Sequence, residues 1–187
     1  QLLWAFFFGL IIASSIYIGK QVDKWDTQAI IAFVLGTAVA YWITIASPAQ
    51  GNEALWFVFL SGLIAISALI LPGISGSFIL LLMGMYTFII PTVKNALSTF
   101  ETQSLIILAV FGLGCLVGLA TFSRVISWTF KNYKNQTLAL LTGFMVGSLN
   151  KVWPWQNVVK YRTNSHGAEV PWIMENVMPG NYSGEAY

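Results

Sequence analysis

Two places in the sequence carry residue types suited to holding an anion, and the first is the run Pro72-Gly73-Ile74-Ser75-Gly76-Ser77. It directly precedes an apolar stretch that starts near Phe78. Serine caps helix N-termini, and glycine lets a ligand approach the backbone. A helix starting here would direct free N–H groups and its positive dipole end toward a carboxylate or phosphate. The candidate anion-binding residues are Gly73, Ser75, Gly76 and Ser77. The alternative is that these residues only cap a broken helix and permit close packing.

Arg124 is the second candidate, because it ends an apolar stretch and a guanidinium binds phosphate through two parallel hydrogen bonds. The alternative is an interfacial anchor that positions the helix in the bilayer. Lys131 and Lys134, which follow it, are predicted to determine topology only. We therefore assign Arg124 a binding role and the two lysines none.

A catalytic serine is the competing interpretation of the first run, since Gly73-Ile74-Ser75-Gly76 fits the Gly-x-Ser-Gly pattern of rhomboid intramembrane proteases. That chemistry needs a histidine from another membrane helix. The only histidine, His166, lies in a polar tail, and the lone Cys115 excludes a disulfide scaffold or a cysteine-based zinc site. We predict no enzyme activity, no metal and no cofactor.

The elements that position these residues are membrane helices. Of 187 residues, 57% are hydrophobic and 9% are charged, whereas soluble domains carry about 25% charge. Between residues 27 and 93 the only charged side chain is Glu53. A net charge of +2 without a basic stripe excludes a nucleic-acid partner. The apolar runs are continuous rather than alternating, so we predict an all-α polytopic membrane protein.

Four stretches approach the roughly 20 residues that cross a bilayer: residues 2–19, 28–46, 104–123 and, with help from Val152 and Trp153, 137–149. The predicted connections are residues 20–27, 47–53, 94–103 and 124–136. The interval 54–91 is too short for two full spans and is interrupted at residues 72–77. This pattern favours a re-entrant helical hairpin over a kinked helix or a surface turn.

The lysines and arginines place the connections 20–27 and 124–136 in the cytoplasm and the tail, residues 154–187, outside. Residues 6–14 also align with residues 140–148, with which they share a glycine, an apolar run and a serine. The predicted topology runs these copies in opposite directions, as in an inverted-repeat transporter. We therefore expect residues 1–19 to end a truncated first repeat, residues 20–53 to connect, and residues 54–153 to form the second repeat.

Residues 71–86, Leu-Pro-Gly-Ile-Ser-Gly-Ser-Phe-Ile-Leu-Leu-Leu-Met-Gly-Met-Tyr, resemble the signature of the PopT-type bacterial polyprenyl-phosphate translocases. Further similarity lies in residues 6–15, 122–124 and 147–155. Members of that family have a second Pro-Gly-x-Ser-Gly copy and a further C-terminal membrane helix, so this chain resembles their latter part. The resemblance implies that the protein returns undecaprenyl phosphate from the outer to the inner leaflet of the bacterial cytoplasmic membrane for cell-wall synthesis.

Two other functions remain open. A membrane scaffold without transport activity would use the glycine-rich break for packing alone. A small-anion permease would use the same fold for a soluble substrate. The sequence predicts membrane lipids and a polyprenyl phosphate as partners, and it does not predict the coupling ion or the oligomeric state.

Overall fold

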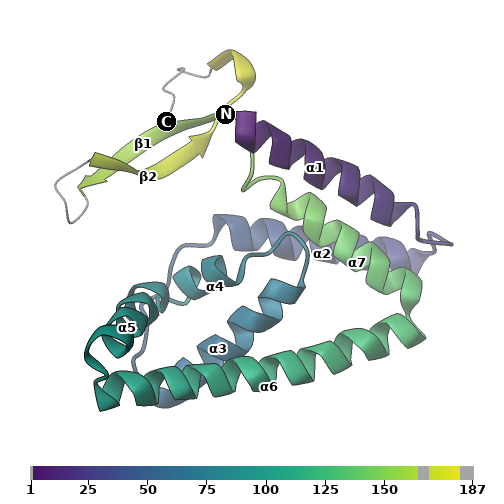
Figure 1. The fold of residues 1–187 in the computed structure, drawn as a ribbon. Helices are drawn as coiled ribbons and strands as arrows, with labels where there is room; N and C mark the ends of the chain where they lie inside the picture. Colours follow the sequence, from purple (N-terminus) through teal and green to yellow (C-terminus); the bar gives the residue numbers. More distant parts are fainter. Residues whose placement is uncertain (1, 164–168, 182–187) are drawn as a thin grey trace.

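The computed structural model describes residues 2–163 and 169–181, and helices dominate it (Figure 1). In chain order the elements are α1 (Leu2–Gly19), α2 (Thr27–Ile45), α3 (Leu55–Ile70), α4 (Gly76–Leu82), α5 (Tyr86–Thr99), α6 (Thr102–Asn132), α7 (Lys134–Ser148), β1 (Gln156–Thr163), β2 (Glu169–Asn176) and a short 3-10 helix, η1 (Pro179–Asn181). Among the described residues, α1, α2 and α6 are long and apolar enough to cross a membrane, and α4 with α5 adds a fourth candidate if that bent pair is one span.

The helices α1 and α2 match the predicted spans closely, but two predicted connections are wrong. Residues 94–99 continue α5, and residues 124–132 continue α6, which reaches 31 residues, or about 46 Å. Neither stretch contains glycine or proline, so its polar side chains interrupt the apolar pattern without interrupting the helix. The chain turns instead at Phe100, whose φ is 49°, and at Tyr133.

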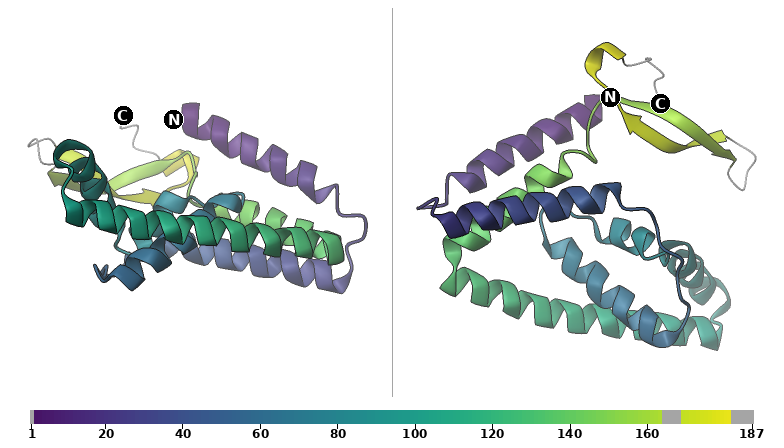
Figure 2. Two further views of the ribbon diagram at one scale, coloured as in Figure 1. Left: turned by 60° about the horizontal axis from the view of Figure 1, so that its bottom comes forward. Right: turned by 180° about the vertical axis from the view of Figure 1, so that it is seen from behind.

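The helices pack in two groups (Figures 1 and 2). The first helix group is α1, α2 and α7, and the second helix group is α3, α4, α5 and α6. Residues 46–54 connect the groups once, and Tyr133 connects them again between α6 and α7. The groups meet at this α6–α7 junction and at the turn between α3 and α4.

Pairs of glycines four residues apart bring the helices of each group into close contact. Gly114 and Gly118 of α6 face the backbone of α3, whereas Gly143 and Gly147 of α7 face the backbone of α2. A methyl group at any of these positions would meet main-chain atoms of the neighbouring helix. Small residues at this spacing are the common way for membrane helices to approach closely.

The predicted break in the interval 54–91 is present, since α3 ends at Ile70 and α4 begins at Gly76. The hairpin turn, residues 71–75, contains Gly73 at φ +84°, a conformation that favours glycine. A second break was not predicted. The helix α4 has only seven residues, and Gly84, at φ +69°, follows its end. The axes of α4 and α5 are bent by 113° relative to each other. The predicted end of the hairpin at Pro91 is wrong, because Pro91 lies inside α5.

The chain returns at the end of α4 to the place where it entered α3. The amide of Ala49 donates to the carbonyl of Leu82 at 2.7 Å, and Gly51 lies against Gly84. The α3–α4 hairpin therefore begins and ends at the connection 46–54. Gly118, near the middle of α6, packs against Leu63 and Ile66, so the hairpin turn begins about two helical turns beyond that level.

The helices α1 and α7 run in opposite directions, as predicted, because Phe8 contacts Trp153 whereas Gly19 lies beside Thr142. The two predicted basic connections also lie at one end of the molecule. There the amide of Asp23 donates to Asn135 Oδ1 at 3.1 Å, and Lys134 Nζ lies 3.1 Å from Asp23 Oδ2.

The tail after α7 contains a two-stranded antiparallel hairpin that was not predicted. Gln156 pairs with Asn176 at one end of the ladder and Thr163 with Glu169 at the other. It is attached to the end of α7, where the Asn176 amide donates to Asn150 Oδ1 at 2.8 Å and the Trp153 indole donates to the Val177 carbonyl. The two strands lie beside the N-terminal end of α1 (Figure 1).

Candidate functional site

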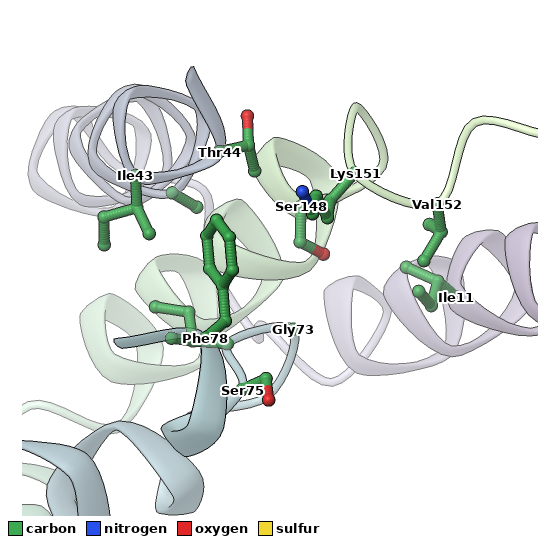
Figure 3. A pocket seen from close by; sticks show the side chains of 11 residues that line it. Ile11, Ile43, Thr44, Gly73, Ser75, Phe78, Ser148, Lys151 and Val152 are labelled. Carbon is green, nitrogen blue, oxygen red and sulfur yellow. The ribbon is translucent and has the colours of Figure 1, made fainter. Parts of the chain in front are cut away.

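A cavity of about 300 Å³, here called the tip cavity, lies between the two helix groups at the hairpin turn. The second group contributes the turn and the start of α4, and the first group contributes one wall from each of its helices. The lining residues are Ile11, Ala40, Ile43, Thr44, Gly73, Ile74, Ser75, Phe78, Ser148, Lys151 and Val152. In Figure 3 the Phe78 ring stands between Ile43 on one side and Ser148 and Lys151 on the other, with Thr44 above it.

The turn enters the first helix group through Gly73. A Cβ at this position would lie 2.6 Å from Ser148 Oγ and 3.1 Å from the Phe144 carbonyl. Ser148 is buried, and its hydroxyl donates to the Met145 carbonyl at 2.8 Å. The absence of a side chain at Gly73 thus allows the hairpin turn to reach the C-terminal end of α7.

Ser75 and Ser77 are both exposed, and their hydroxyl oxygens lie 2.8 Å apart in a hydrogen bond. Ser75 stands at the N-cap position of α4 without bonding to a backbone N–H there, so the expected side-chain cap is not formed. Because α4 has only seven residues, its dipole is a small source of positive potential. The hydroxyls themselves are the polar groups that the turn offers.

The predicted site residues do not all gather at the tip cavity. Gly73 and Ser75 line it, whereas Ser77 lines a shallow pocket beside Leu81 and Tyr86. Gly76 is buried, and a Cβ there would lie 2.6 Å from the Ala65 carbonyl of α3. Gly76 therefore allows the start of α4 to pack directly against the backbone of α3.

Arg124 is exposed on α6 and is not among the residues that line the tip cavity. It lies in the C-terminal third of that helix, toward the end that carries Lys131 and that precedes Lys134 of α7. The structure therefore separates Arg124 from the four tip residues, although the sequence analysis grouped all five.

Lys151 is the only charged residue in the lining of the tip cavity, and the sequence analysis gave it no role. It follows α7 in a turn where its amide donates to the Ser148 carbonyl at 2.9 Å. Its Nζ lies 4.6 Å from the centre of the Phe78 ring. No local pattern joins a lysine after α7 to a glycine-rich turn more than 70 residues earlier, so only the packing of the two groups identifies it.

A second, larger hollow of about 700 Å³, here called the apolar groove, adjoins the tip cavity. Ile43 lines both, and Ile79 in the groove follows Phe78 in the cavity. Its lining is almost entirely apolar: Trp42, Ile43, Ile45, Ala46, Ser47, Ala49, Phe57, Ile79, Leu82 and Met83. A largely apolar cavity that contains an ammonium and a few hydroxyls, next to a larger apolar groove, suits a ligand with a charged head and a hydrocarbon tail.

The described residues contain no group of three or more histidine, cysteine, aspartate or glutamate side chains placed to hold a metal ion. His166, on which the protease interpretation depended, lies outside the described residues. The described part of the site thus consists of hydroxyls, backbone, one ammonium and apolar side chains.

Apolar helices packed through glycines, with a cavity that contains a few polar groups at a broken hairpin, define a multi-pass helical membrane protein with a candidate ligand site. The sequence model of the undecaprenyl phosphate translocase-like family matches residues 1–170, and the chain belongs to this family. A polyprenyl-phosphate transporter of Vibrio cholerae is 42% identical over 177 residues, which are 95% of this chain and 55% of the relative. A polyprenyl-phosphate transporter of Staphylococcus aureus is 34% identical over 161 residues, 80% of this chain and 56% of the relative.

The chain thus spans little more than half the length of these two curated relatives. No solved structure matches it.

Proposed function

We propose that the protein to which this chain belongs transports undecaprenyl phosphate, or a related polyprenyl phosphate, from the outer to the inner leaflet of the bacterial cytoplasmic membrane. The transported lipid would be the carrier reused in cell-wall synthesis. The observation that carries the proposal is the tip cavity, which adjoins an apolar groove in a chain of the undecaprenyl phosphate translocase-like family.

The phosphate would bind at the hairpin turn. Ser75 and Ser77 offer exposed hydroxyls, Gly73 offers accessible backbone, and Gly76 holds the turn against α3. Arg124 would receive the head group later, at the basic end of the molecule, which we assign to the cytoplasm. The two phosphate contacts would then act one after the other.

The α3–α4 hairpin would be re-entrant, entering and leaving the membrane at the connection 46–54. The Ala49–Leu82 hydrogen bond brings its ends together, and the turn lies near the level of the middle of α6. Broken backbone at that depth is tolerated where it lines a cavity. In this proposal α1 and α7 are corresponding helices of an inverted repeat, and residues 54–153 form the second repeat.

The isoprenoid tail would lie along the apolar groove and continue into lipid. A hydrocarbon chain gains about 25 cal/mol for each Å² of apolar surface removed from water, but gains little by moving from lipid to protein. The groove therefore orients the tail, and discrimination depends on the head group. The polar groups of the tip cavity are few, and they lie on the turn and on the first helix group, which supports this division.

Transport of undecaprenyl phosphate by purified full-length protein in liposomes tests the proposal. Ser75→Ala should lower lipid-phosphate binding and flipping roughly tenfold to a hundredfold, because a hydrogen bond to a charged group is worth about 1.5–3 kcal/mol. Ser98→Ala, at an exposed serine of α5, is the matched control and should behave as wild type.

Wild-type protein that flips no polyprenyl phosphate would favour the scaffold interpretation. Transport of a soluble anion into liposomes that contain no lipid phosphate would favour the permease interpretation.

A further inference from the structure

Lys151 carries the one positive charge in the lining of the tip cavity, and among the described residues no carboxylate pairs with it. The ion pair in this part of the chain joins Lys134 to Asp23, at the other end of α7. The Lys151 ammonium instead lies over the Phe78 ring, at 4.6 Å. An aromatic face attracts a cation much less strongly than a full negative charge does.

We propose that Lys151 is the phosphate-binding cation of the tip cavity and that it exchanges the Phe78 ring for the lipid head group. This inference rests on the proposed function, because it assigns the ligand of the same cavity. A lysine suits the task, since its ammonium is a compact charge with three donors on a flexible stem that can leave one partner for another.

The position of Lys151 makes a bound phosphate a bridge between the two helix groups. Lys151 and Ser148 belong to the first group, whereas Ser75 and Phe78 belong to the second. The Ser148 hydroxyl already donates to the Met145 carbonyl. Lys151 is therefore the donor that the first group has available, and the Ser75 hydroxyl and the turn backbone are the donors of the second.

The apolar remainder of the lining increases the importance of the single charge. Ile11, Ile43, Ile74 and Val152 lie around the polar groups in the lining of the cavity. Charge interactions are stronger where the surroundings are less polar than water. A neutral prenyl alcohol would fill the same space but could offer the ammonium only a neutral acceptor and no charge attraction, so Lys151 should set the preference for phosphate over alcohol.

Binding of undecaprenyl phosphate and of undecaprenol to full-length protein, measured side by side, tests this assignment. Lys151→Gln should weaken phosphate binding roughly tenfold to a hundredfold and leave alcohol binding unchanged, which also shows that the variant is folded. Lys151→Arg should retain most of the affinity. Lys94→Gln, which removes a lysine from the exposed surface of α5, is the matched control and should behave as wild type.

The Phe78→Leu variant tests the contribution of the aromatic ring separately from that of the Lys151 charge. Removing the ring releases the ammonium from this contact, so phosphate binding should tighten roughly twofold to fivefold. A loss as large as that of Lys151→Gln would overturn the exchange of partners. Inorganic phosphate should displace the lipid only at far higher concentration, and equal potency would overturn the assignment to a lipid head group.

An unaltered preference for phosphate over alcohol in Lys151→Gln, with wild type binding the phosphate lipid, would overturn the role of Lys151 and leave the proposed function standing. Wild-type protein that binds neither lipid would overturn the proposed function itself.

Discussion

Single residues at the hairpin turn divide between holding the turn in place and offering contacts to a ligand. Gly73 and Gly76 belong to the first kind, since a side chain on either would collide with a neighbouring helix. Ser75, exposed with its hydroxyl bonded only to Ser77, belongs to the second. A serine substitution should therefore affect binding, whereas a glycine substitution should affect folding first.

Gly73→Ala should lower stability by about 1–2 kcal/mol from the positive φ alone, with a further loss from the contact with Ser148. Thermal unfolding of the full-length protein in detergent measures this. Gly9→Ala is the matched control, because nothing lies within 4 Å of a Cβ there and α1 has ordinary helical geometry. Equal melting temperatures for the two variants would contradict the observed turn geometry.

The local sequence was sufficient to find Gly73 and Ser75, because a glycine- and serine-rich break in an apolar run is visible without any knowledge of packing. Lys151 was missed, because its role depends on α7 lying beside the turn. Arg124 was grouped with the tip on its chemistry alone, and the structure places it elsewhere along α6. Chemistry that joins distant parts of a chain requires the tertiary structure.

In this chain, glycines and left-handed backbone conformations mark the ends of helices better than a change from apolar to polar residues does. The hairpin break was predictable from Pro72 and Gly73, and the second break at Gly84 was hidden in an apolar run. Conversely, the polar residues after Arg124 predict a connection, but they contain no helix breaker, and α6 continues through them to Asn132. The two-stranded hairpin after α7 was missed because a polar tail has no apolar periodicity to reveal strands.

Gly114→Ala should destabilise the pairing of α3 with α6, because the added methyl group would meet the Phe59 carbonyl. Overpacking of this kind typically costs about 1–3 kcal/mol. Gly112→Ala, two residues away with nothing within 4 Å of its Cβ, should be neutral or stabilising by up to about 1 kcal/mol. Unfolding of both variants in detergent makes the comparison, and a stable Gly114→Ala protein would show that α3 and α6 do not pack this closely.

The described part of the chain consists of two helix groups, with the candidate site between them, and the two-stranded hairpin that follows α7. Helices within each group are joined by glycine-mediated backbone contacts, whereas at the tip cavity the groups meet through Gly73 and the Lys151–Phe78 pair. A ligand in that cavity contacts both groups, so its binding should change how they are placed relative to each other.

Spin labels can measure this change once Cys115, the only cysteine, is replaced by serine. Labels at Tyr17 in α1 and Leu97 in α5, both exposed, report the distance between groups. Labels at Tyr17 and Ile30 report a distance within the first group. Undecaprenyl phosphate should shift the first distribution and leave the second unchanged. A shift of both, or of neither, would contradict two separately moving groups.

The two connections between the groups also limit the direction in which they can separate. Residues 46–54 join them beyond the end of α2, and Tyr133 joins them at the opposite, basic end, so a clamshell opening toward either water phase would stretch one connection. Rotation about the line through both connections stretches neither. In the membrane orientation that we propose, such a rotation would part the groups sideways, along the plane of the bilayer. A lateral opening of this kind would let the head group of a membrane lipid enter while its hydrocarbon tail stays in the bilayer.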